Sequence, residues 1–245
     1  GYKQHTRLVM FNYSKLSKSV HILRYKVFYV LKYRLKMLLW NITIYSGFTL
    51  KRFLDLLVIL LFSPIFIPTF LIICIAIKLD SYGPIIFKQK RVGFGGREFN
   101  FFKFRTMYQG SELELSNIYH LNESKDGVIF KLKKDPRVTK IGRLLRKTSM
   151  DELPQIFNVI KGDMSLVGPR PPIRDEVEKY SLDERKRLLI KPGITCLWQI
   201  SGRSDLPFKQ QVELDKEYIR SRGILKDIYI LFKTIPAVLS GKGAY

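Results

Sequence analysis

The chain has 245 residues, of which 46% are hydrophobic, so it is long enough for one domain with a buried core and additional segments. It carries 43 basic and 21 acidic residues, and the net charge of +22 indicates an anionic partner: phosphorylated substrates, an anionic membrane or nucleic acid. Two widely separated cysteines and three scattered histidines argue against a disulfide framework, a zinc site and a histidine-based nucleophilic triad.

The basic residues are concentrated at the start of the chain. Eleven Lys and Arg precede the first acidic residue, Asp55, and the most hydrophobic stretch follows directly, which favours a membrane surface over a nucleic-acid groove. Residues 20–40 place Leu and Val at helical spacing among basic side chains. This pattern predicts an amphipathic helix in a membrane interface, with a soluble helix packed on its own domain as the alternative.

Residues 53–77 form an apolar run with one charge, Asp55. As a straight helix the run would be ~37 Å long, enough to cross a ~30 Å hydrocarbon core. However, Ser63-Pro64 and Pro68 interrupt it, and both flanks are basic, so a single crossing would leave one basic flank on the wrong side. We therefore predict a re-entrant helix-break-helix, in which Ser63 or neighbouring protein satisfies the backbone groups freed at Pro64.

Residues 85–92 and 98–106 are rich in Ile, Phe and Val and are separated by Gly93-Phe94-Gly95-Gly96. We predict a small β-hairpin here. A phosphate-binding glycine loop is the weaker alternative, because no Gly-Lys-Ser/Thr follows. Further along, helical spacing predicts helices over 139–147, 154–160, 208–222 and 224–239, the last one in the core or on a membrane surface.

The stretch from Asp135 to Pro172 surrounds one carboxylate pair, Asp151-Glu152, with basic residues. Pro154 suits the first position of a helix, so both carboxylates would stand just before a helix N-terminus. Free amides and the helix dipole there favour anions, including a phosphate held through a bridging cation.

Each of these features also has a purely structural interpretation. Ser149-Met150-Asp151-Glu152 fits a capping box, in which Glu152 only closes the helix N-terminus; Pro154 would then fall in the second turn, which argues against it. Arg170, flanked by Pro169 and by Pro171-Pro172, either belongs to a rigid turn or has its backbone preset to meet phosphate oxygens.

Several long motifs, in order over about residues 50–245, resemble those of the bacterial monotopic phosphoglycosyl transferases, also called bacterial sugar transferases. The motifs are KRFLD (51–55), FKQKRVGFGGREFNFFKFRTM (87–107), SMDELPQIFNVIKGDMSLVGPRP (149–171) and PGITCLWQISGR (192–203). The departures are Cys196, where the family commonly has Gly, and Met150, where it often has Leu; Cys196 puts the local turn in doubt.

The resemblance implies a reaction. Such enzymes bind a UDP-sugar with Mg²⁺, and the Asp of the Asp-Glu pair, here Asp151, attacks the phosphate that bears the sugar. UMP leaves, and undecaprenyl phosphate or another polyprenyl phosphate then takes the sugar phosphate from the enzyme, which initiates synthesis of a lipid-linked glycan for capsule, exopolysaccharide or O-antigen.

The resemblance also assigns roles to residues. Asp151 and Glu152 are carried over as the catalytic pair that associates with the metal. Four basic residues are carried over as phosphate-binding, and Ser63-Pro64 matches the re-entrant break of the family. The four basic residues are Lys103, Arg105, Arg146 and Arg170.

The expected fold is therefore α+β and mostly helical: a monotopic, membrane-anchored domain with a re-entrant helix-break-helix and a small β-hairpin. The expected divisions are a basic N-terminal segment (1–50), a re-entrant membrane helix (51–80) and a catalytic domain (81–245). Whether the N-terminal segment is the remnant of a longer membrane region is left open. The expected place is the cytoplasmic face of a bacterial inner membrane, with membrane lipid but no nucleic acid as a partner, and with homo-oligomerisation left open. The competing hypotheses are a membrane-associated phosphohydrolase and a non-catalytic membrane scaffold.

Overall fold

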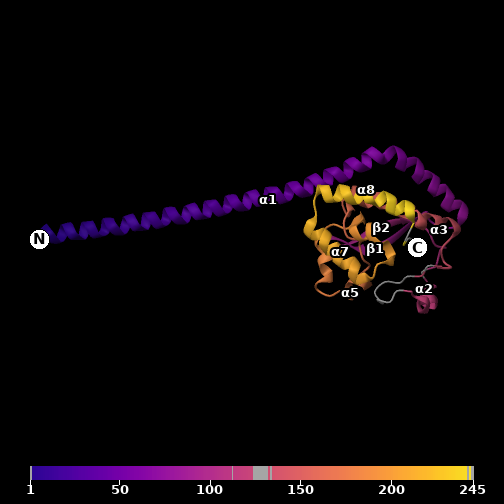
Figure 1. Cartoon of the computed structure of the whole chain (residues 1–245). Coiled ribbons are helices and arrows are strands. Elements are labelled where there is room, and N and C mark those ends of the chain that lie inside the picture. Colours follow the sequence, from indigo (N-terminus) through magenta and orange to yellow (C-terminus); the bar gives the residue numbers. More distant parts are fainter. Residues whose placement is uncertain (1, 112, 124–131, 133, 242, 244–245) are drawn as a thin grey trace. The chain divides into compact units, whose positions relative to one another are not determined.

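The computed structural model describes residues 2–111, 113–123, 132, 134–241 and 243. The chain separates into two units, Gly1–Lys51 and Arg52–Tyr245, which are described one at a time. The elements of both units follow one another along the chain, and Figure 1 labels some of them. In chain order they are α1 (Tyr2–Asp80), β1 (Ile86–Val92), η1 (Phe94–Gly96), β2 (Glu98–Phe104), α2 (Leu115–Ile118), η2 (Tyr119–Leu121), α3 (Lys140–Lys147), η3 (Met150–Glu152), α4 (Gln155–Lys161), β3 (Ser165–Val167), α5 (Arg174–Glu178), η4 (Glu184–Leu189), β4 (Gly193–Thr195), α6 (Leu197–Ser201), η5 (Arg203–Asp205), α7 (Phe208–Ser221) and α8 (Ile224–Ser240).

The first unit is helical, as predicted for residues 20–40. Its side chains are described over 28–38 and 47–51. Over 28–38, apolar residues such as Phe28 and Leu31 and basic residues such as Lys32 and Arg34 are all exposed. A helix that exposes large apolar side chains beside basic ones has the composition of a membrane-interface helix, so contact with lipid stays a prediction for this unit.

The second unit begins with the apolar part of α1, whose start is attached to the folded domain. Arg52 donates a hydrogen bond of 2.8 Å to the carbonyl of Ile160, at the end of α4. Asp55 is buried, and its carboxylate accepts bonds from the Ser165 hydroxyl (2.8 Å) and the Leu166 amide (3.2 Å). The one charge in the apolar run therefore fastens this helix to β3.

The end of α1 is attached to the same domain. Ile77 is buried in a cluster with Phe104 of β2 and Leu145 of α3. The Asp80 carboxylate accepts a bond of 3.2 Å from the Ile141 amide in the first turn of α3. Both ends of the segment 52–80 thus contact one folded unit, although a straight helix of this length would separate them by ~42 Å.

The middle of the segment is apolar and exposed. Gly47–Asp80 is long and apolar enough to cross a membrane, and it is a candidate membrane anchor. Figure 1 shows that α1 bends before it descends to its end at Asp80. The exposed side chains include Leu60, Leu61, Phe62, Ile65, Ile67, Leu71, Ile72 and Ile75.

The structure refines the predicted helix-break-helix, because α1 stays helical through Pro64 and Pro68. A proline inside a helix removes the hydrogen bond to the carbonyl four residues earlier, which for Pro64 is that of Leu60. The Ser63 hydroxyl donates to this carbonyl at 2.8 Å. Ser63 therefore satisfies the group that Pro64 frees, as predicted, and the direction changes by a bend within a continuous helix.

The predicted β-hairpin is confirmed. β1 pairs antiparallel with β2, with Val92 opposite Glu98 and Ile86 opposite Phe104, and the glycine-containing segment turns between them as η1. Gly95 and Gly96 have φ of 66° and 80°, a left-handed backbone that suits glycine. These two glycines therefore allow the backbone to turn between the two strands.

The core lies between the hairpin, α4 and the C-terminal helices. Phe99 and Phe101 of β2, Val159 of α4, Tyr218 of α7 and Ile230 of α8 are buried in one cluster. The helices predicted over 139–147, 154–160, 208–222 and 224–239 are confirmed within one or two residues as α3, α4, α7 and α8.

The short parallel pair of β3 and β4 was not predicted. Cys196 follows it as the N-cap of α6, with an extended backbone (φ −152°) and a completely buried side chain. This conformation is open to any residue, so the departure from the common glycine leaves the turn intact.

One face of α8 is apolar and exposed. Leu225, Tyr229, Phe232, Ile235 and Leu239 recur at helical spacing, and all are exposed. Helix α8 thus contributes Ile230 to the core and also exposes an apolar stripe, and contact of this stripe with a membrane surface stays a prediction.

Candidate active site

Asp151 and Glu152 lie in the turn η3 between α3 and α4. Ser149 precedes them with a left-handed backbone (φ 56°), and its side chain makes no capping bond; its hydroxyl accepts a hydrogen bond from Arg203 instead. Helix α4 begins at Gln155 with Pro154 as its N-cap, so the capping box is not formed. The two carboxylates thus stand just before a helix, as predicted from Pro154.

Lys103 joins the two carboxylates. From β2, its ammonium lies 3.0 Å from Asp151 Oδ2 and 2.9 Å from Glu152 Oε1. All three side chains are more than four-fifths buried, so water screens these charges weakly. Their position is fixed in part by Asn158 of α4, whose side chain bonds the backbone of Phe102 on β2 at 3.1 Å.

Arg170 contacts the Glu152 carboxylate as well. Its Nη1 lies 3.1 Å from Glu152 Oε1. The flanking prolines are held by neighbouring backbone: the Pro169 carbonyl accepts from Gly193 at 3.0 Å, and the Pro172 carbonyl accepts from Val92 at 2.8 Å. The two interpretations of this segment are therefore compatible, since a rigid turn presents Arg170 to the carboxylate pair.

Arg146 approaches from α3. Its Nε donates to the Thr106 hydroxyl at 3.0 Å, which fixes the direction of the guanidinium. Burial lowers the pKa of Arg146, while the negative charges of Asp151 and Asp135 act in the opposite direction. Arg146 is thus close enough to Asp151 for their charges to interact, although no direct hydrogen bond joins them in the described structure.

Arg105 occupies a different place from the predicted one. Its guanidinium donates to the carbonyls of Tyr82 (2.8 Å) and Ser81 (2.7 Å), just after the end of α1. The strand β2 ends at Phe104, so the alternation that aims Lys103 at the carboxylates does not continue to Arg105. Arg105 therefore fastens the end of the anchor helix, and the site keeps Lys103, Arg146 and Arg170.

Arg91 is a site residue that sequence reasoning missed. It is on the same face of the hairpin as Lys103, and its Nη1 donates to the Pro171 carbonyl at 3.0 Å. Burial, followed by the charge of Arg170, lowers the pKa of Arg91 to about 10. Two cations held this close favour a bound anion between them. Only the pairing of the strands shows the shared face: Arg91 is opposite Phe99, which lies four residues before Lys103 in β2.

The electrostatics of Glu152 show why this carboxylate stays ionised. Burial opposes ionisation, but the charges and hydrogen bonds of Lys103 and Arg170 outweigh it and lower the pKa of Glu152 to about 2. A carboxylate that remains negative under ordinary conditions can act as a cation ligand.

The donor set fits a magnesium ion that arrives with a phosphorylated substrate. Among the described residues, no group of three or more His, Cys, Asp or Glu is arranged to hold a metal by itself. Mg²⁺ is commonly held by one or two carboxylates, with substrate phosphates and waters completing its shell. Asp151 and Glu152 supply those two carboxylates.

Comparison with known proteins places this site in a family context. A sequence profile described as bacterial sugar transferase matches residues 46–241, which include every residue of the site. The matched segment also contains the apolar part of α1 and the exposed helix α8.

Three similar proteins illustrate the relationship. The chain is 48% identical over 204 residues to the galactosyl transferase CpsE of Streptococcus agalactiae, covering 82% of this chain and 44% of that protein. It is 43% identical over 211 residues to the undecaprenyl-phosphate galactose phosphotransferase of Salmonella typhimurium (84% and 44%). It is 40% identical over 198 residues to the exopolysaccharide production protein ExoY of Sinorhizobium fredii (80% and 88%). The chain spans less than half the length of the first two.

Proposed function

Because the chain belongs to the bacterial sugar transferase family, we propose that it transfers a sugar 1-phosphate from a UDP-sugar to undecaprenyl phosphate and releases UMP. The observation that carries this proposal is the buried Asp151-Glu152 pair, held by Lys103 and Arg170 in a unit that has a candidate membrane anchor. The product would initiate a lipid-linked glycan for capsule, exopolysaccharide or O-antigen.

In the first half-reaction, an Asp151 carboxylate oxygen attacks the phosphorus that bears the sugar. The bond from this phosphorus to the bridging oxygen breaks, and the electron pair leaves with UMP. An acyl phosphate then joins Asp151 to the sugar phosphate. Repulsion between the carboxylate and the phosphate is the main barrier, and nearby cations reduce it.

In the second half-reaction, a phosphate oxygen of undecaprenyl phosphate attacks the same phosphorus. The bond to Asp151 breaks, the free carboxylate is restored, and the lipid diphosphate sugar leaves. Two consecutive displacements at one carboxylate allow a single site to serve a soluble donor and a lipid acceptor in turn.

The basic residues have different roles in the proposed reaction. Lys103 orients both carboxylates, while Arg146, Arg170 and Arg91 are directed by neighbouring hydroxyl, carboxylate or carbonyl groups toward the place where the diphosphate would lie. Planar guanidinium groups suit this place because they donate two parallel hydrogen bonds to phosphate oxygens. Mg²⁺, held by Asp151 and Glu152, would neutralise part of the phosphate charge.

The membrane attachment fits a lipid acceptor. Both ends of the segment 52–80 bond to the domain, and the middle exposes apolar side chains, which supports a re-entrant anchor with both flanks on the cytoplasmic face. The exposed stripe of α8 would lie on the same membrane surface. The domain would then stand where the donor and the acceptor meet.

A UMP-release screen tests the proposal. The full chain in lipid nanodiscs is incubated with a set of UDP-sugars, with and without undecaprenyl phosphate. UDP-galactose is the first donor to try, because two of the relatives named above carry galactose in their names. We expect sustained UMP release that requires undecaprenyl phosphate. Sustained release without a lipid acceptor would favour the phosphohydrolase, and no release with any donor would favour the scaffold.

A further inference from the structure

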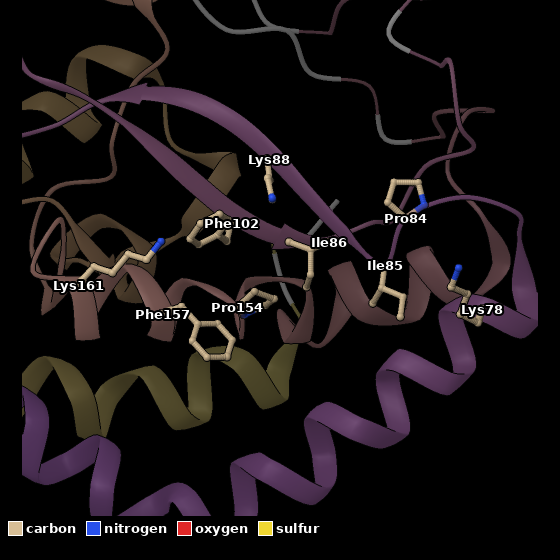
Figure 2. Close-up of a pocket in the computed structure, with 9 residues that line it drawn as sticks. All are labelled: Lys78, Pro84, Ile85, Ile86, Lys88, Phe102, Pro154, Phe157 and Lys161. Carbon is tan, nitrogen blue, oxygen red and sulfur yellow. The ribbon is translucent and has the colours of Figure 1, made fainter.

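An open groove lies on the face of the hairpin that the proposed reaction does not use. Its volume is about 620 Å³, and it is bounded by the hairpin, α4 and the end of α1. Figure 2 shows Ile86, Phe102 and Phe157 along an apolar floor, with Lys78, Lys88 and Lys161 around it. An apolar surface with a cationic rim matches a ligand that has an anionic head and an apolar body.

The three lysines are not neutralised by carboxylates. Lys78 donates to the Gly83 carbonyl at 3.1 Å, and the Lys161 ammonium lies 4.7 Å from the centre of the Phe102 ring. Lys88 is exposed, directly opposite Phe102 in the hairpin. Among the residues that the structure describes, none of the three forms an ion pair, so their charges are available to an anion.

The groove is continuous with the anchor. The ring of Phe157 meets that of Phe70 on α1 edge-on, with centroids 5.7 Å apart. Next to Lys78 on α1, Leu79 is exposed, as are Ile72 and Ile75 in the preceding turns. A lipid beside α1 could therefore place its head at the lysines without leaving the membrane surface.

Strand alternation separates this groove from the catalytic pair. Lys88 and Phe102 share one face of the hairpin, whereas Lys103, which contacts Asp151 and Glu152, points to the other face. A phosphate held by Lys88 and Lys161 is therefore on the wrong side of β2 for transfer to Asp151. This position argues that the groove binds a lipid that stays with the protein, and it argues against binding of the lipid acceptor there.

We propose that the groove binds the phosphate head of an anionic phospholipid, which seats the hairpin and α4 on the membrane beside the anchor. The phosphate accepts hydrogen bonds from Lys88 and Lys161, and the glycerol and upper acyl carbons lie on Ile86, Phe102 and Phe157. This inference depends on the membrane attachment of α1 but not on the transfer reaction.

Native mass spectrometry of the full chain in a neutral detergent tests the site. The probes are dioctanoyl phosphatidylglycerol, dioctanoyl phosphatidylcholine and farnesyl phosphate. The variant is Lys88→Ala with Lys161→Ala, and the matched control is Lys140→Ala with Lys209→Ala, two exposed lysines that do not line the groove. Lys88→Arg with Lys161→Arg keeps the charge and guards against a folding artefact.

We expect the wild-type chain to bind phosphatidylglycerol at least tenfold more tightly than phosphatidylcholine. The groove variant should lose this preference, while the control and the arginine variant keep it. Equal binding of the two phospholipids, or an equal loss in the control, would overturn the proposal. Lysine-dependent binding of farnesyl phosphate at least tenfold tighter than that of phosphatidylglycerol would also overturn it, because the groove would then be the acceptor site.

Discussion

Arg146 and Arg143 are three residues apart on α3, yet only Arg146 is directed toward the catalytic pair. The Nε–Thr106 bond holds its guanidinium, whereas the Arg143 side chain is exposed. Arg146→Lys keeps the charge but loses the fork and the bond to Thr106, so we expect UMP release to fall at least tenfold. Arg143→Lys should change it less than twofold.

A steady-state UMP assay on both variants checks this, with liposome co-sedimentation as a second measurement. Membrane association should not change in either case. Lys32→Ala with Arg34→Ala, in the first unit, should show the opposite behaviour, since each basic residue near an anionic surface contributes about 1 kcal/mol to membrane binding. Full activity of Arg146→Lys would remove this residue from the phosphate-binding set.

Glu152 gives a prediction for pH. Its pKa in the folded chain is about 2, below the ordinary value of 4.5, because Lys103 and Arg170 outweigh its burial. The unfolded chain therefore binds more protons than the folded chain between these values. The stability that Glu152 contributes is fully present above pH ~5.5 and is lost as the pH falls through 4.5 toward 2.

The measurement is denaturant unfolding of wild type and Glu152→Gln across this pH range, followed by the fluorescence of buried Trp198. The difference between the two unfolding free energies should be constant from pH 8 to about 5.5 and should shrink below 4.5. Lys103→Met removes the largest favourable charge, so it should raise the pKa of Glu152 in the folded chain toward 4.5 and make the change with pH smaller. A difference that already shrinks at pH 6.5 would contradict the assignment.

The sequence motifs predicted where the site lies, but they did not predict the contacts of each basic residue. Lys103 and Arg105 belong to one motif, and both were expected at phosphate, but the strand ends between them and their side chains separate. Arg91 lies in the same motif but was missed, because only the pairing of the two strands shows that it shares a face with Lys103.

At the scale of the element, Asp55 attaches the apolar part of α1 to β3. Asp55→Leu would make the run more hydrophobic, which by hydropathy alone should improve the anchor. It would also leave the buried Ser165 hydroxyl and Leu166 amide without their acceptor. Because an unpaired buried polar group costs about 1–3 kcal/mol, we expect the variant to lower the free energy of unfolding by about that amount or more.

Thermal unfolding of the full chain in nanodiscs measures the effect. Thr69→Leu is the matched control, since the Thr69 hydroxyl bonds only the Ile65 carbonyl of its own helix in the described structure. The control should change the melting temperature little. If Asp55→Leu were as stable as wild type, the carboxylate would not be the link between the anchor and β3.

The bend in α1 leads to a topology prediction. With both helix ends bonded to one domain, residues 51 and 79 should lie on the same, cytoplasmic face, and residue 67 should lie in lipid. Single cysteines at these positions, in a chain whose Cys74 and Cys196 are replaced by Ala, can be labelled with a membrane-impermeant maleimide. We expect positions 51 and 79 to react only from the cytoplasmic side and position 67 to stay unlabelled. Labelling of 51 and 79 from opposite sides would mean that α1 spans the membrane.

Elements that have a recognisable pattern in their own residues were predictable, and elements without such a pattern were not. The hairpin follows from its alternating strands and glycine turn, and α4 ends at Gly162, where the backbone turns left-handed (φ 89°). The strands β3 and β4 have three residues each and pair in parallel across a long separation, so no local pattern marks them. A break in α1 was expected from its prolines, but the helix continues through them, and the Ser63 hydroxyl bonds the Leu60 carbonyl that Pro64 frees.

At the scale of the whole molecule, the proposed reaction requires two substrates of opposite solubility to meet at one carboxylate. A re-entrant anchor and an exposed apolar helix would keep the second unit at the membrane surface, while the basic site remains open to a nucleotide sugar. The alternatives of a phosphohydrolase and a scaffold share the charge and the anchor. They differ from the transferase in what becomes of Asp151 during turnover.

The most direct measurement is therefore peptide mass spectrometry of Asp151 after incubation of the full chain in nanodiscs with Mg²⁺ and UDP-galactose, without acceptor. The account predicts stoichiometric UMP release and a hexose phosphate attached to the peptide that contains Asp151. Undecaprenyl phosphate, added afterwards, should remove the adduct, and Asp151→Asn should form none. A chain that transfers sugar phosphate to lipid without an adduct on Asp151, or an Asp151→Asn variant with near-normal turnover, would contradict the aspartyl mechanism.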